Sequence, residues 1–268
     1  MDPARGDYGW MPDDDPILSR PYGPQDLAPA LHTTGMQKTI LVQAAPTTNE
    51  TEYLLGIADA TPHVAGVVGW IDFEDSTQRK TLERLARHPK FKGVRPMIQD
   101  LPDDRWMLRD DIQWAYKAII DLDLTFDALG FPRHIPHFIT LLDRYPDMRT
   151  VLDHCLKPQL RSHTPEALAD WQMGMTELAN TNAYLKLSGL LTEADTPITA
   201  DDLRPYTDHA IAAFGPDRTM WGSDWPVLRL RTEYVDWHAM AHQLTDHLDA
   251  AAKTAIFGTT AATFYRLD

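Results

Sequence analysis

The sequence has 268 residues, of which 43% are hydrophobic and 24% charged, as in globular proteins that bury a large core. Its 39 acidic and 25 basic residues give a formal net charge of −14, which disfavours nucleic acids and anionic membrane surfaces as partners. The single cysteine, Cys155, cannot form an internal disulfide, and no apolar run suits a signal-peptide core or a membrane span. We therefore expect a cytoplasmic protein.

Prolines punctuate residues 1–37, so we expect an irregular N-terminal arm that leads into a short helix near 27–31. From residue 38 onward, short apolar runs alternate with amphipathic stretches, which is the pattern of repeated βα units around a parallel sheet. Barrels of this class commonly reach the length of this chain as one folded unit. We therefore expect a single domain over residues 1–268.

The apolar runs predict seven strands and no eighth. These strands lie at 39–43, 64–70, 92–95, 124–129, 149–153, 183–188 and 218–222. Thr164 before a proline, and Thr199 three residues before Asp202, predict the starts of two helices. Gly215 predicts a left-handed helix end. The pattern indicates an α/β fold of the TIM-type (β/α) barrel class with seven recognisable strands.

Polar side chains follow several of these strands. In α/β barrels the loops after the strands converge on the face that carries the active site. Gln43, Arg95, the pair Asp153 and His154, and Asp224 stand at such positions. Taken alone, His154 is equally compatible with a structural histidine, and Arg95 with a structural ion pair.

Asp224 lies in the segment Trp-Gly-Ser-Asp-Trp-Pro, where Trp225 and Pro226 crowd the carboxylate. A carboxylate so placed can act as a general base toward a bound water. The structural alternative is an aspartate that caps a turn. The aromatic and proline neighbours are unusual for a solvated turn, so they favour the catalytic interpretation.

Lys186 and Ser188 are alternate residues of one predicted strand, so both side chains face the same side of the sheet. Leu185 and Leu187 take the opposite face and would suit a layer of covering helices. We therefore expect Lys186 and Ser188 to point into the barrel.

The remaining reactive side chains are interpreted as structural. Cys155 follows an apolar strand and is expected to be a buried packing residue. His238 and His242 have the spacing of a metal-binding pair, but they lack the glutamate of a zinc-protease motif and are expected on a helix surface. The sequence has no glycine-rich phosphate loop, nucleophile elbow or paired-cysteine zinc motif, which removes several enzyme classes.

Several segments taken together carry a family resemblance over nearly the whole chain. They include Tyr-Gly-Trp-Met at 8–11, Leu-Val-Gln-Ala-Ala-Pro at 41–46, Val-Leu-Asp-His at 151–154, Leu-Lys-Leu-Ser-Gly-Leu at 185–190 and Trp-Gly-Ser-Asp-Trp-Pro at 221–226. Several are ordinary barrel strands by themselves, and the segments of His154 and Asp224, in this order, make the combination specific. With these segments in this order, the chain resembles the lactonase-like branch of the amidohydrolase superfamily. Within that branch it looks most like the L-fucono-1,5-lactonases.

The resemblance implies hydrolysis of a sugar lactone, L-fucono-1,5-lactone or a related aldonolactone, to the sugar acid. Asp224 would deprotonate the attacking water, and His154 would lie near the lactone carbonyl. No cofactor would be required; if a divalent metal such as zinc is present, His154 and Asp224 would be its ligands. A homo-oligomer is compatible with this family. The substrate-binding side chains would be Arg95, Lys186, Trp225, Gln43 and Ser188.

One departure from the family concerns the start of the chain. Members begin with a strand that carries a His-x-His pair shortly before the Tyr-Gly-Trp segment, whereas here Met1 lies only a few residues upstream. Either the start is assigned downstream of that strand, or the barrel has lost it. We favour the first, because an open edge leaves backbone groups unpaired. Two alternatives to the lactonase stay open: a metal-dependent decarboxylase or amide hydrolase of the same superfamily, and a non-catalytic sugar-acid binder.

Overall fold

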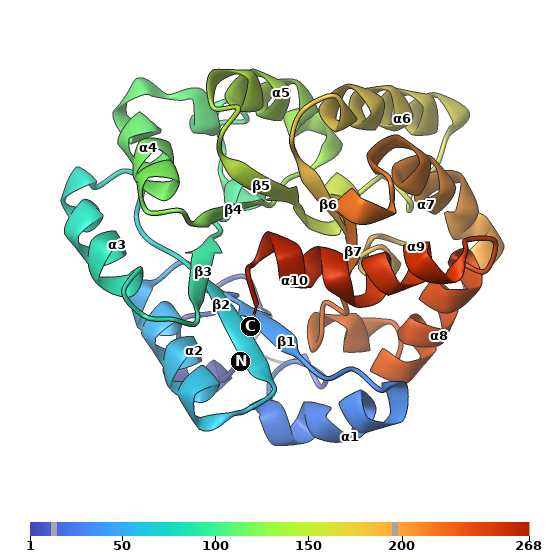
Figure 1. Ribbon diagram of the computed structural model, residues 1–268, viewed down its shortest axis with the longest axis horizontal. Coiled ribbons are helices and arrows are strands. Elements are labelled where there is room, and N and C mark those ends of the chain that lie inside the picture. The colour runs from blue at the N-terminus through green and yellow to red at the C-terminus, as the bar shows by residue number, and fades with distance from the viewer. Residues whose placement is uncertain (12–14, 195–197, 268) are drawn as a thin grey trace.

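A computed structural model describes residues 1–11, 15–194 and 198–267. Its centre is one parallel sheet of seven strands in the order β1 to β7, curled into a barrel wall (Figure 1). The strands are β1 (Thr39–Val42), β2 (Val64–Gly69), β3 (Phe91–Val94), β4 (Thr125–Ala128), β5 (Arg149–Leu152), β6 (Tyr184–Leu187) and β7 (Thr219–Trp221). The predicted TIM-type class and all seven predicted strands are confirmed. Within the described residues, β1 pairs only with β2 and β7 only with β6.

Helices surround this wall (Figure 1). They are α1 (Pro24–Thr34), α2 (Thr48–Ala60), α3 (Arg79–Leu85), α4 (Gln113–Asp121), α5 (Ile135–Arg144), α6 (Pro165–Ala179), α7 (Ala200–Phe214), α8 (Tyr234–Leu244), α9 (Ala250–Thr254) and α10 (Thr260–Phe264), with a π-helix at Ala255–Thr259. The predicted starts are confirmed, because the Thr164 and Thr199 hydroxyls cap α6 and α7. Gly215 has a positive φ of 76°, but its ψ of 160° is extended, so the predicted left-handed helix end is wrong.

Residues before β1 are tied to the barrel wall. The helix predicted near 27–31 is confirmed as α1, and it packs against α8. Upstream of it, the Tyr8 hydroxyl donates to the Glu50 carboxylate on α2 at 2.9 Å. Arg229, in the loop after β7, donates to the Tyr22 hydroxyl at 3.1 Å. Residues 12–14 of the predicted arm lie outside the described residues.

The C-terminal segment closes the barrel at the amino ends of the strands. In Figure 1, α10 crosses in front of the strands, and the chain ends near the centre of the sheet. The Arg149 guanidinium donates to the Phe264 carbonyl at 2.7 Å, and the Lys92 ammonium donates to the Arg266 carbonyl at 3.2 Å. The rings of Phe264 and Tyr265 pack inside with Val68, Val151 and Met220.

Tyr265 also reaches the polar centre of the barrel. Its hydroxyl donates to the Asp127 carboxylate on β4 at 2.7 Å, and the Lys186 ammonium from β6 contacts the same oxygen at 2.5 Å. Burial raises the pKa of Asp127, and the Lys186 charge opposes that shift. Since a buried charge is costly unless it is paired and hydrogen-bonded, these contacts stabilise the interior.

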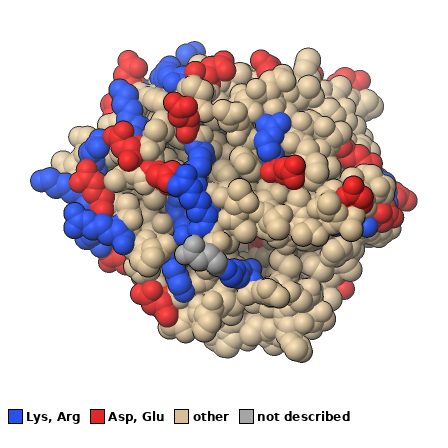
Figure 2. All heavy atoms as spheres, in the orientation of Figure 1, with Lys and Arg blue, Asp and Glu red and all other residues tan. Residues whose placement is uncertain are grey.

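Both signs of charge occur on the face closed by α10. Figure 2 shows Lys and Arg residues, bordered by Asp and Glu, from the left edge to the middle of this face. Most of the right half of the view is uncharged. Among the described residues, no helix combines the length and the apolar character that crossing a membrane requires.

The contact between Tyr265 and Asp127 predicts a specific loss of stability. Tyr265→Phe keeps the ring but removes a hydrogen bond to a buried carboxylate, so the free energy of unfolding should fall by about 1–3 kcal/mol. Urea denaturation followed by circular dichroism measures this change. Tyr53→Phe is the control. Tyr53 is a half-buried residue of α2 whose ring lies under the Arg5 guanidinium. Its substitution should change the free energy of unfolding by less than about 0.5 kcal/mol. Equal effects of both changes would contradict the prediction.

Candidate active site

Six of the seven predicted site residues come together at the carboxyl ends of the strands, in two connected groups, and Trp225 lies apart from them. One group joins Ser188, His154 and Asp224, from the ends of β6, β5 and β7. The other joins Gln43 and Arg95, from the ends of β1 and β3, to the buried network of Lys186. Asp153 and His154 are consecutive in the chain, so the two groups are neighbours.

His154 stands on an unusual turn. Residues 154–157 all have positive φ, from 50° to 54°, in the left-handed region that non-glycine residues rarely adopt. The turn is held by the Trp171 indole, which donates to the Cys155 carbonyl at 2.9 Å. Strain of this kind persists only where the surrounding structure imposes it, and it concentrates at functional sites. The turn brings the His154 ring to the end of the barrel instead of continuing along β5.

The His154 ring is fixed between two neighbouring strand ends. Its Nδ1 lies 2.8 Å from the Ser188 hydroxyl, and its Nε2 lies 3.7 Å from the Asp224 carboxylate. A Cβ atom on Gly189, whose φ is 66°, would stand 2.5 Å from the His154 ring, so only glycine fits there. Burial lowers the pKa of His154 below its ordinary value, which favours the neutral ring.

Asp224 is accessible, whereas Ser188 is not. The Asp224 side chain is 19% exposed, while Ser188 is 2% exposed. The 3.7 Å between His154 and Asp224 is too long for a hydrogen bond, so both groups keep capacity for a third partner such as water. Ser188 lacks the access that a nucleophile requires. Its hydroxyl contacts the His154 ring.

Gln43 and Arg95 hold each other. The Gln43 amide donates to the Arg95 carbonyl at 2.6 Å, and the Arg95 guanidinium donates to the Gln43 carbonyl and to Asp153. Gln43 Oε1 and Arg95 Nε are buried and have no hydrogen-bond partner among the described residues. Buried polar atoms are normally satisfied, so these two atoms are candidates to meet a ligand or a water.

Lys186 lies on β6 with its side chain inside the barrel, as the strand alternation predicted. Its ammonium contacts Asp127 at 2.5 Å and Asp153 at 2.7 Å. Burial alone would raise the pKa of Asp153, but Lys186 and Arg95 hold it well below its usual range. Its two carboxylate partners suit Lys186 to positioning Asp153, and through it Arg95, beneath the site.

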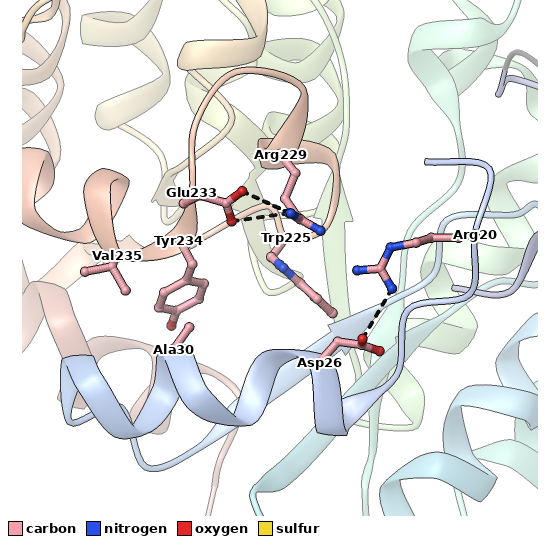
Figure 3. A pocket seen from close by; sticks show the side chains of 8 residues that line it. All are labelled: Arg20, Asp26, Ala30, Trp225, Arg229, Glu233, Tyr234 and Val235. Carbon is pink, nitrogen blue, oxygen red and sulfur yellow. Dashed lines mark hydrogen bonds and ion pairs between the residues drawn. The ribbon is translucent and has the colours of Figure 1, made fainter. Parts of the chain in front are cut away.

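Trp225 faces the N-terminal segment. Its ring meets the Tyr22 ring edge-on at 5.3 Å and lines a pocket of about 280 Å³ between α1 and the start of α8 (Figure 3). Two arginines also line this pocket, and each is paired with a carboxylate: Arg20 with Asp26 and Arg229 with Glu233. Trp225 directly follows Asp224 in the chain, so one wall of this pocket is next in sequence to the candidate general base.

Asp127 and Tyr265 support the site but were not singled out from the sequence. A signal existed for Asp127, because Thr125 and Asp127 alternate within an apolar strand and therefore face the same side. The sequence around Tyr265 carries no such pattern. Its role depends on the C-terminal segment returning to the barrel axis, which is a tertiary contact.

Two structural interpretations hold in the structure. Cys155 is buried, and burial raises the pKa of its thiol to about 12, which leaves it unreactive. His242 is exposed on α8, as expected, with its ring stacked on Phe257 at 4.0 Å. His238 is half-buried beside Trp221, so its predicted place on the helix surface is only partly right.

His154 and Asp224 are the side chains of the site that could bind a metal ion. Zinc sites in proteins use three or four protein ligands. His154 and Asp224 offer two, and among the residues that the structure describes no cluster of three or more His, Cys, Asp or Glu side chains is suited to a metal. The described residues therefore do not by themselves make a complete zinc site.

Comparisons with known proteins place the chain in a family. The family model for Amidohydrolase (Amidohydro_2) matches residues 2–267. The chain is 42% identical to an L-fucono-1,5-lactonase of Burkholderia ambifaria, over 99% of this chain and 92% of the relative. It is 36% identical to an L-fucono-1,5-lactonase of Burkholderia multivorans, over 97% and 91%. A crystal structure of an amidohydrolase from B. multivorans with bound zinc superposes with a TM-score of 0.91 at 35% identity, covering 98% of this chain and 95% of that one. The chain therefore belongs to the amidohydrolase family.

Proposed function

We propose that this protein hydrolyses a sugar lactone to the sugar acid, with Asp224 as the general base and His154 beside the reacting carbonyl. The observation that carries the proposal is the pair itself. An accessible carboxylate and a neutral, oriented imidazole face each other at 3.7 Å at the ends of β7 and β5. L-fucono-1,5-lactone or a related aldonolactone is the substrate that the names of the two curated relatives favour.

The reaction runs in two steps. Asp224 takes a proton from a water while the water oxygen attacks the lactone carbonyl carbon, so the carbonyl oxygen becomes an oxyanion. Hydrogen bonds from His154 and Arg95 stabilise that oxyanion more strongly than the uncharged carbonyl. The tetrahedral intermediate then expels the ring oxygen, which receives the proton held by Asp224. The ring opens to the free acid, and Asp224 regains its charge.

Ser188 sets the direction of the His154 proton in this proposal. When its hydroxyl donates to Nδ1, the neutral ring must carry its hydrogen on Nε2, the nitrogen that faces Asp224. Nε2 can then donate to the oxyanion. Ser188 is therefore a positioning residue.

Replacing the carboxylate tests the general base. Asp224→Asn should lower kcat by about 10³-fold, because the amide accepts no proton at neutral pH, while the lactone still binds. Lactone hydrolysis and calorimetric binding measure the two effects. Asp208→Asn, on the exposed side of α7, is the control and should keep full turnover. Full activity of Asp224→Asn would remove the mechanism.

The state of His154 predicts the pH profile. Burial lowers the pKa of His154 below the ordinary 6.5, so the ring is still neutral at pH 6.5 and gains a proton only at a lower pH. The value of kcat/KM should therefore decline only when the pH falls below 6.5. An acid limb that stays in place in His154→Gln would assign the titration to another group.

Ser188→Ala removes one hydrogen bond to His154 Nδ1, worth about 1 kcal/mol, and should lower kcat roughly fivefold with KM unchanged.

The metal-dependent decarboxylase or amide hydrolase stays as a second candidate, because a relative of the same fold was crystallised with zinc. The two candidates differ in whether turnover requires a bound metal ion. If lactone hydrolysis depends on the side chains named above, treatment with a chelator should change kcat by less than about twofold. Elemental analysis of the purified protein, before and after chelation, accompanies the assay. Stoichiometric zinc, with activity lost on its removal and restored by its return, would favour the second candidate.

A further inference from the structure

An aromatic cleft opens at the carboxyl ends of β1, β2 and β3. Its walls come from the segments that follow these strands, around residues 46–47, 70–74 and 96–97, and from the N-terminal residues around Trp10. The cleft has a volume of about 650 Å³, within the roughly 300–1,000 Å³ of small-molecule sites. Pro96 directly follows Arg95, so the cleft adjoins the barrel end that carries the site.

Trp10 is exposed in this cleft and Trp70 is half-buried, whereas Phe73 and Trp106, which also line it, are buried. Trp10 is 38% exposed, and its Nε1 donates to the Ala44 carbonyl at 2.6 Å. The Trp106 indole donates to Glu74 at 2.7 Å, and its ring lies 5.7 Å from Phe73. The exposed Trp10 ring offers a flat apolar face with negative charge density, which suits the C–H-rich face of a sugar ring.

All charged side chains that line the cleft in the described residues are carboxylates: Asp7, Asp72, Glu74 and Asp100. Two of them face cations outside the cleft, since Asp7 pairs with Arg5 and Glu74 with Arg109. Carboxylates accept hydrogen bonds and donate none. The cleft therefore suits a ligand rich in hydroxyl donors, and it disfavours a second negative charge.

We propose that this cleft is a specificity subsite for the uncharged, polyhydroxylated part of the lactone. It selects neutral sugar lactones against lactones of the same size that carry a carboxylate. The inference rests on the proposed function for its place in catalysis, but the binding preference is a separate property. Trp10 contributes the stacking surface, and Asp72 and Asp100 contribute the charge.

The charge is tested with a matched pair of lactones that differ only at C6, neutral L-galactono-1,4-lactone and carboxylated L-galactaro-1,4-lactone. We expect kcat/KM to favour the neutral lactone, and Asp72→Asn/Asp100→Asn to reduce that preference about tenfold. Asp170→Asn/Asp208→Asn removes the same charge from exposed positions on α6 and α7, and should leave the preference unchanged. An equal effect of both double variants, or no preference in the wild type, would overturn the proposal.

The stacking surface is tested by binding in the Asp224→Asn background, where turnover does not interfere. Calorimetry with L-galactono-1,4-lactone should show an affinity about fivefold to tenfold weaker for Trp10→Ala, and near the original for Trp10→Phe, which keeps an aromatic face. Unchanged affinity in Trp10→Ala would overturn the subsite. If lactone hydrolysis is absent from the wild type while this binding pattern holds, the proposed reaction fails and the subsite stands.

Discussion

The site depends on one buried ion pair network, in which the Lys186 ammonium lies between the carboxylates of Asp127 and Asp153. Three strands supply these groups, and a lone charge at that depth would be strongly unfavourable. Asp153 in turn holds Arg95, and the next residue along the chain is His154. The polar centre of the barrel therefore fixes the height and direction of the groups above it before any ligand arrives.

This arrangement separates fixed from accessible chemistry. Lys186, Asp127 and Ser188 satisfy one another or a neighbour and have little exposure. Asp224 and His154 keep atoms without a close partner, at the level where the strands end. If Asp224 receives and returns a proton as proposed, such surroundings favour the reaction, because its neighbours need not move.

The sequence allowed a correct prediction of the strands, because each is a short apolar run between polar segments, and a parallel sheet buried on both faces requires that composition. Asp224 and His154 were found by the same logic, as polar residues placed directly after such runs. The distance between the two side chains could not be predicted, since it depends on the left-handed turn at 154–157. That turn contains no glycine that would indicate it in the sequence. The environment of Lys186 could not be predicted either, because its partner Asp127 is bound by Tyr265, which lies near the end of the chain.

The residues ahead of β1 contribute no strand to the described sheet, yet they reach both cavities beside the site. Tyr22 braces Trp225 at one, and Trp10 covers the other. Substitutions in this short segment can therefore reshape what the enzyme recognises without disturbing the ion pairs inside the barrel. Exposed positions of the segment such as Trp10 can therefore change during evolution at low cost to folding, whereas its buried residues Leu27 and Leu31 belong to the core and cannot.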